Sequence, residues 1–145
     1  MLIQLALASL MVVVTVLVHL FGLATIIRLI RSERPIFRRL HFSPLTVLLG
    51  ASIGVFAVHT IEIWLYAALY LAIGAFGHFE MSLYFSTVTY ASIGYGDVLM
   101  PHAWRLLGAI EGATGIIMLG WSTAFLVSLL SQLKLFGHDW LTARP

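Results

Sequence analysis

The sequence predicts an all-α integral membrane protein with three transmembrane helices and one short re-entrant helix. Of its 145 residues, 61% are hydrophobic and only 10% are charged, whereas a soluble domain carries about a quarter charged residues. The apolar residues gather in three long segments, and a fourth apolar segment is too short to cross a bilayer. So few charges cannot cover a water-exposed surface, and the bilayer is therefore the expected solvent.

The first apolar segment predicts an N-terminal transmembrane helix over residues 1–31. Residues 2–27 carry no charged side chain, and as a helix they would be roughly 39 Å long, more than the hydrocarbon core of about 30 Å. No basic residue precedes the segment, as one would in a secretory signal, so we expect an uncleaved anchor. We expect this extra helix to pack against the next transmembrane helix as a brace.

Most of the basic residues lie in one stretch, which predicts the orientation in the membrane. Five of the eight Lys and Arg residues are Arg28, Arg31, Arg34, Arg38 and Arg39. By the positive-inside rule this stretch is cytoplasmic, which places the N-terminus outside and a short tail, residues 137–145, in the cytoplasm. The expected location is a bacterial inner membrane.

The linker over residues 32–43 is expected to lie at the cytoplasmic membrane surface. Apolar side chains interleave with its arginines, a pattern typical of a short interfacial helix. The arginines between Arg28 and Arg39 would then contact anionic lipid headgroups. The apolar residues of this linker are Ile36, Phe37, Leu40 and Phe42.

The other two long segments predict an outer helix over residues 44–76 and an inner helix over residues 103–136. Between them, residues 79–91 are apolar and aromatic with small hydroxyl side chains, and about 13 residues are too few to span a bilayer. They predict a re-entrant pore helix, with Glu80 near the positive end of its dipole. The opposite end would direct partial negative charge toward the membrane centre and favour a cation there.

The six residues after this short helix predict an ion-coordinating strand. Gly94 and Gly96 can adopt backbone conformations that a residue with a Cβ atom resists, so successive carbonyl groups can point to one side. Four such strands around an axis would form rings of carbonyl oxygens that replace the hydration shell of a monovalent cation. The Ser92 hydroxyl would form the innermost ring, and Asp97 would lie at the outer mouth.

This arrangement resembles the pore domain of the potassium-channel family, in particular small bacterial ion-channel proteins with a bare pore. The family pattern Thr-Val/Ile-Gly-Tyr/Phe-Gly-Asp is similar to residues 92–97, and residues 85–89 are similar to the pore helix that precedes it. The resemblance implies a homotetramer that conducts K⁺ passively, with the pore domain over residues 44–136. It implies K⁺ binding by the Ser92 hydroxyl and by the filter backbone of Ser92, Ile93, Gly94, Tyr95 and Gly96.

Three positions depart from the family pattern. Ser92 stands where the family usually has Thr, and Ala91 stands where a second Thr is common. Val88 stands where some members place a Glu that pairs with the filter Asp, so Asp97 needs another partner, and we expect Tyr84 of the pore helix. Two alternatives to a potassium-selective channel therefore stay open: a weakly selective monovalent cation channel, and a non-conducting regulatory or structural membrane subunit.

The inner helix contains candidates for a hinge and a gate. The spacing of Gly115 and Gly120 resembles that of hinge glycines in the family, whereas Gly108 and Gly112 form a small-xxx-small pattern that favours close helix packing. Below the hinge, we expect an apolar ring to face the pore axis and to gate by dewetting. Its candidate residues are Ile116, Thr123, Ala124 and Val127.

Four histidine or glutamate side chains fall inside the predicted spans, where charged groups are costly and usually paired. Glu62 lies one helical turn from His59, and His19 is predicted at a similar depth. These residues would either make the channel sensitive to pH or join the N-terminal helix to the outer helix by a hydrogen bond. Glu111 would either support the back of the filter or add negative potential near the pore.

Other functional classes find no support in the sequence. There is no cysteine, no arginine ladder of a voltage sensor, no catalytic triad and no ligand spacing typical of a metal site. We therefore expect no enzyme activity, no cofactor other than permeant K⁺ and no nucleic-acid partner.

Overall fold

The computed structural model describes residues 1–31 and 43–133, and every regular element in these ranges is helical. The long helices are α1 (Leu2–Ile30), α3 (Pro44–Ala72) and α5 (Arg105–Gln132). The short ones are α4 (Phe79–Tyr90) and the 3₁₀ turn η1 (His102–Trp104). The expected interfacial helix over residues 32–43 and the tail over residues 137–145 lie outside the described residues, apart from Ser43.

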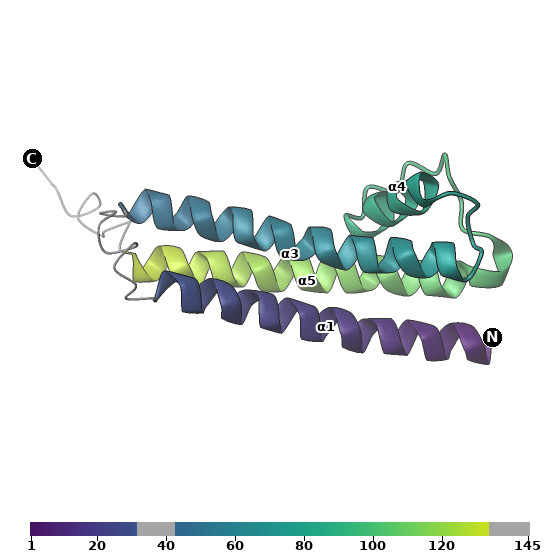
Figure 1. The fold of residues 1–145 in the computed structure, drawn as a ribbon, viewed down its shortest axis with the longest axis horizontal. Coiled ribbons are helices and arrows are strands. Elements are labelled where there is room, and N and C mark those ends of the chain that lie inside the picture. The colour runs from purple at the N-terminus through teal and green to yellow at the C-terminus, as the bar shows by residue number, and fades with distance from the viewer. Residues whose placement is uncertain (32–42, 134–145) are drawn as a thin grey trace, which may run out of the picture.

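The three long helices lie side by side, and α4 sits at one end of the bundle against α3 and α5 (Figure 1). Helix α1 and helix α5 run in the same direction, and α3 runs in the opposite direction (Figure 1). In the described part of the chain, Leu2–Ile30, Pro44–Ala72 and His102–Gln132 are long and apolar enough to cross a membrane. The chain is therefore built as an integral membrane protein with three spans.

Helix α3 begins and ends with recognisable signals. The Ser43 side chain accepts a hydrogen bond from the Thr46 N–H at 3.3 Å, and Pro44 occupies the first turn, where its missing N–H costs nothing. At the other end Gly74 has a φ of +67°, and the N–H groups of Gly74 and Ala75 donate to the carbonyls of Leu71 and Tyr70. This pair of bonds is a Schellman motif, and it ends the helix four residues before the predicted residue 76.

The helices pack closely where glycines face branched side chains. A Cβ atom at Gly22 of α1 would lie 2.4 Å from a Val58 methyl group on α3, and a Cβ atom at Gly54 would lie 3.0 Å from Ile26. Small residues at such positions let membrane helices approach each other. Two apolar clusters fill the bundle, one around Tyr70 and Leu107 near α4, the other around Val55 and Leu129 near the opposite end.

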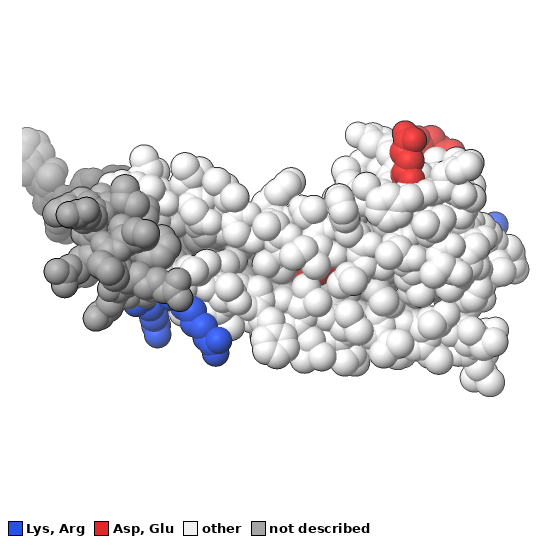
Figure 2. Space-filling model, viewed as in Figure 1, with Lys and Arg blue, Asp and Glu red and all other residues white. Residues whose placement is uncertain are grey.

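Charged side chains separate along the bundle. Figure 2 shows acidic side chains gathered over the α4 end and basic side chains beside the far end of α1, where Arg28 and Arg31 lie. Arg105 begins α5 and lies at the α4 end. The surface between the two ends is almost free of charge, as expected for helices that face lipid.

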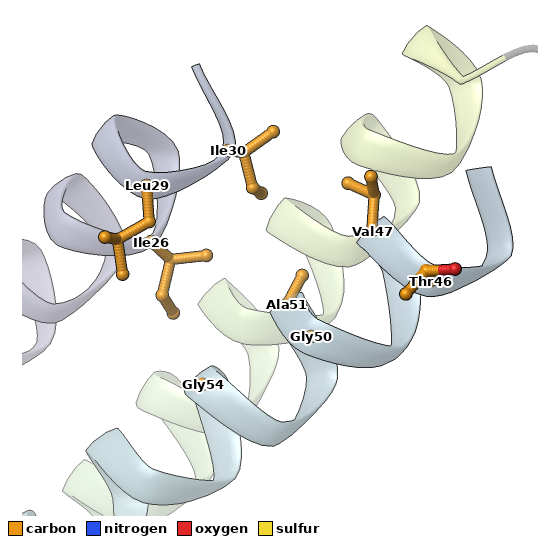
Figure 3. Close-up of a pocket in the computed structure, with 8 residues that line it drawn as sticks. All are labelled: Ile26, Leu29, Ile30, Thr46, Val47, Gly50, Ala51 and Gly54. Carbon is orange, nitrogen blue, oxygen red and sulfur yellow. The ribbon is translucent and has the colours of Figure 1, made fainter. Parts of the chain in front are cut away.

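An apolar groove opens between α1 and α3 near the arginine end. It has a volume of about 240 Å³, and Figure 3 shows Ile26 and Ile30 of α1 pointing toward the start of α3, with Leu29 beside them. Gly50 and Gly54 form part of its wall and contribute no side chain.

Candidate functional site

Helix α4 ends in the same motif as α3, but with a serine in the place of the glycine. The N–H of Ser92 donates to the Thr89 carbonyl at 3.0 Å, and the N–H of Ile93 donates to the Val88 carbonyl at 2.9 Å. Ser92 has a φ of +58°, in the left-handed region that glycine normally supplies at this position of a Schellman motif. A residue with a Cβ atom is strained there, so the first filter residue carries backbone strain.

Left-handed backbone recurs at every second residue of the filter. Ser92, Gly94 and Gly96 have φ values of +58°, +60° and +75°, whereas Ile93 and Tyr95 between them do not lie at positive φ. In an ordinary strand successive carbonyls alternate between two sides. A strand whose backbone alternates in handedness can instead direct successive carbonyls to one side, which is the arrangement that ion coordination requires.

Two pore-helix residues contact the filter. The Tyr84 hydroxyl donates to Asp97 at 2.6 Å, and this bond holds the pKa of the Asp97 carboxyl below its usual range. The Val88 carbonyl accepts from the N–H of Ile93 and, at 3.3 Å, from that of Gly94. Val88 therefore contacts the filter through its backbone, while its side chain is buried.

The filter strand is exposed on the isolated chain. Ile93 and Tyr95 keep 49% and 70% of their surface accessible, and Ser92 and both filter glycines are also exposed. The Ile93 side chain is therefore available for contact with other chains or with lipid.

Behind the filter, Glu111 joins three helices. It is fully buried, and its two carboxyl oxygens lie 2.5 Å from the hydroxyl oxygens of Tyr70 on α3 and Ser86 on α4. The Ser86 oxygen also lies 2.9 Å from the Ile63 carbonyl. These contacts favour support of the pore helix over a source of negative potential in the pore.

Helix α5 approaches the end of the pore helix very closely at Gly115. A Cβ atom there would lie 2.1 Å from the Tyr90 carbonyl oxygen, so the position requires glycine for packing. Gly108 and Gly112 also face α4, through Phe85 and Thr89 respectively. Gly120 has no neighbour within 4 Å of such a Cβ atom, and it is exposed together with the gate candidates Ile116, Thr123, Ala124 and Val127.

The other three polar residues predicted inside the spans, His19, His59 and Glu62, lie in one buried cluster in the bundle. His19 and His59 each place Nδ1 3.0 Å from a different oxygen of Glu62. The Tyr90 hydroxyl donates to Glu62 at 2.5 Å, and Ser122 of α5 lies against the far nitrogen of both imidazoles. Sequence reasoning missed Tyr90 and Ser122, because nothing in the sequence indicates which face of each helix they occupy.

Comparison with known proteins supplies one match. A family model described as ion channel matches residues 44–132, from the first residue of α3 to the last residue of α5. The match covers more than half of the chain and leaves α1 outside. The comparisons with curated proteins and with solved structures found no match.

Proposed function

This chain belongs to the ion channel family, and from that premise we propose that four copies form a potassium-selective channel that conducts K⁺ passively. The observation that carries the proposal is the alternation of left-handed residues at positions 92, 94 and 96. It supports a filter strand whose carbonyls face one axis, and rings of such carbonyls replace the hydration shell of K⁺.

The geometry of a single strand supports the proposed assembly of several chains. One strand contributes only one oxygen to each ring, so several chains must surround the ion. The exposure of Ile93 and Tyr95 on one chain supports the same assembly. Native mass spectrometry is expected to give four times the mass of the 16.0 kDa chain.

The orientation proposed is an outside N-terminus with Arg28 and Arg31 in the cytoplasm. The N-terminus and α4 lie at one end of the bundle, and the arginines lie at the other (Figures 1 and 2). Because the chain has no cysteine, Gly77→Cys and Ser32→Cys can each carry a unique thiol. An impermeant maleimide added outside should label the first and spare the second, and the reverse pattern would overturn this orientation.

The test of selectivity is a flux measurement on the purified chain in liposomes. We expect barium-sensitive K⁺ flux and a reversal potential near the K⁺ equilibrium value in asymmetric K⁺ and Na⁺. Gly94→Ala should abolish the flux, because position 94 requires positive φ. Gly77→Ala is the matched control, since no atom lies within 4 Å of its Cβ position and its φ is ordinary.

Two results would replace this proposal. A reversal potential near zero under bi-ionic K⁺ and Na⁺ would identify a weakly selective monovalent cation channel. The second result is a wild-type chain that assembles but gives no K⁺ flux, and whose behaviour Gly94→Ala leaves unchanged. That result would identify a non-conducting regulatory or structural subunit.

A further inference from the structure

The cluster of His19, His59, Glu62, Tyr90 and Ser122 lies outside the filter, and the proposed conduction does not use it. His19 comes from α1, His59 and Glu62 from α3, Tyr90 ends α4 and Ser122 lies on α5. Each of these side chains is buried, and those of His19 and Glu62 are fully buried. Every helix of the bundle therefore contributes to one polar centre at membrane depth.

Counting hydrogens shows that an ionised Glu62 leaves this centre one hydrogen short, which an added proton or another cation can make good. With Glu62 ionised and both imidazoles neutral, a single hydrogen each is available from His19, His59, Tyr90 and Ser122. If both Nδ1–H groups donate to Glu62, both Nε2 atoms must accept the one Ser122 hydrogen. If His59 carries its hydrogen on Nε2 instead, Ser122 can accept it. The bare Nδ1 of His59 then lies 3.0 Å from the Glu62 carboxylate with no hydrogen between them, and 3.1 Å from the Tyr90 oxygen.

The two imidazoles are arranged alike, which favours a metal ion over an added proton. Both present Nδ1 to Glu62 at 3.0 Å, and both present Nε2 to the same Ser122 oxygen, at 2.9 and 3.4 Å. A shared proton would give the two rings different roles. A metal ion on the Nδ1 side gives them the same role, because a hydroxyl oxygen has two lone pairs and can accept both Nε2–H groups.

The donor atoms suit a borderline transition metal. One atom each from His19, His59 and Glu62 lie within 4.8 Å of one another. Zinc bonds to nitrogen and oxygen of about 2.0–2.2 Å place tetrahedral donors about 3.3 Å apart, and each Nδ1 lies 3.0 Å from one oxygen of Glu62. Imidazole nitrogen selects zinc-like ions over Mg²⁺ or Ca²⁺, and histidines that bind metal donate their other N–H to a fixed acceptor, here Ser122.

We propose that His19, His59 and Glu62 bind a divalent transition-metal ion of the zinc class, with the Tyr90 oxygen beside the fourth position. The ion ties α1 to α3 next to the C-terminal end of the pore helix. Because all three of these side chains are buried, the role that we propose for the ion is to hold the bundle together.

The first test measures metal on the full-length protein, purified in detergent without a polyhistidine tag. Elemental analysis of wild type should find about one zinc per chain, as a closed structural site requires. After chelation, Co²⁺ should restore binding and give the visible absorption bands of tetrahedral cobalt. Wild-type protein that binds neither ion while remaining folded would overturn the proposal and leave a shared proton as the missing cation.

Variants locate the ion. His19→Gln and Glu62→Gln should lose the cobalt bands, and Ser122→Ala should weaken metal affinity roughly 10–100-fold, as expected when only the orienting acceptor is lost. His78→Gln and His102→Gln are matched controls, because both histidines are exposed and lie outside the cluster. Metal retained at wild-type affinity in His19→Gln and Glu62→Gln would place it elsewhere and refute the site. Because the wild-type cobalt titration needs no variant, the test holds even if a variant fails to fold.

Discussion

Two features of the backbone favour glycine at position 92, which is occupied by serine. Ser92 is the residue after the C-cap of α4 and the first residue of the filter, and its φ is +58°. Helix α3 places Gly74 at the equivalent point of its own Schellman motif. Ser92 thus keeps the hydroxyl that we propose for the innermost ion ring at the expense of backbone strain.

Substitutions at Ser92 should separate stability from ion binding. Ser92→Gly is expected to stabilise the protein by up to about 1 kcal/mol, because glycine relieves the left-handed strain. Ser92→Thr should destabilise it, since a β-branched residue at positive φ is an outlier. Thermal unfolding in detergent measures both, and K⁺ flux should fall only in the glycine variant. Higher stability of the threonine variant would contradict the strained geometry.

Glu111 is expected to be a neutral acid. Ser86 has one hydroxyl hydrogen but lies within bonding distance of both Glu111 and the Ile63 carbonyl. A protonated Glu111 resolves this, because it donates to Ser86 while Ser86 donates to Ile63. Its other oxygen still accepts from Tyr70.

The amide variant tests this protonation state. Glu111→Gln can donate to Ser86 and accept from Tyr70, so its unfolding free energy should stay close to that of wild type. Glu111→Leu leaves both hydroxyls without this partner and should cost about 1–3 kcal/mol. Denaturation in detergent compares the two. A glutamine variant as unstable as the leucine variant would show that the carboxylate is ionised.

At the scale of elements, the contact of α5 with the end of α4 determines how the inner helix sits behind the filter. The sequence predicts Gly115 as a hinge, and this role stays a prediction. The structure adds a different requirement for the same residue: the Tyr90 carbonyl occupies the space of any Cβ atom.

Alanine at two glycines of α5 separates packing from helix propensity. Gly115→Ala should destabilise the protein by about 1–3 kcal/mol, because α5 must move away from backbone atoms that cannot yield. Gly120→Ala should be neutral or stabilising by up to about 1 kcal/mol, since alanine is the better helix former and its Cβ meets nothing within 4 Å. Thermal unfolding is again the measurement. Equal effects at both positions would rule out the close approach.

At the scale of the whole molecule, α1 is tied to the rest of the chain along its length. Gln4 accepts from the Leu106 N–H at the start of α5, His19 pairs with Glu62, and Gly22 receives Val58. Without α1, Glu62 loses a partner at a depth where an unpaired charge is costly.

Deletion of residues 1–30 should therefore prevent recovery of stable oligomers from detergent. Deletion of residues 1–3 is the control, because Leu2 and Ile3 are 79% and 70% exposed. Size-exclusion chromatography after membrane extraction measures both. Stable, conducting oligomers without α1 would show that the helix is not a brace.

The sequence was sufficient to predict the features that depend on the length of apolar segments and on the placement of glycines. Three spans and a short fourth helix follow from apolar length alone, and the glycines of residues 92–97 indicated a strand with unusual backbone. The predicted end of the outer helix at residue 76 lies beyond the observed end of α3 at Ala72. Ala75 and Phe76 continue the apolar run beyond Gly74, although the helix has already ended there. Ser92 gave no sign of positive φ, since residue type favours glycine there.

The buried cluster lay beyond sequence reasoning for a different reason. His19 and Glu62 are 43 residues apart, and periodicity cannot fix the rotation of α1 about its own axis. Their similar depth was predictable; their contact was not. No ligand spacing indicated a metal site, because the donors come from two helices and Ser122 from a third.

The pairing of His19 with Glu62 also limits how α1 and the ion channel region can change independently in evolution. The region shared with other ion channels begins at residue 44, yet one of its buried acids is satisfied from residue 19. A gene fusion or truncation at that boundary would divide a single polar core. In a fusion of α1 to another pore domain, the His19 imidazole would be buried without the carboxylate that Glu62 provides here. We therefore expect substitutions at position 19 of α1 to be coupled to substitutions at positions 59 and 62 of α3. Replacing α1 alone, or residues 44–132 alone, would leave part of this cluster without its partner.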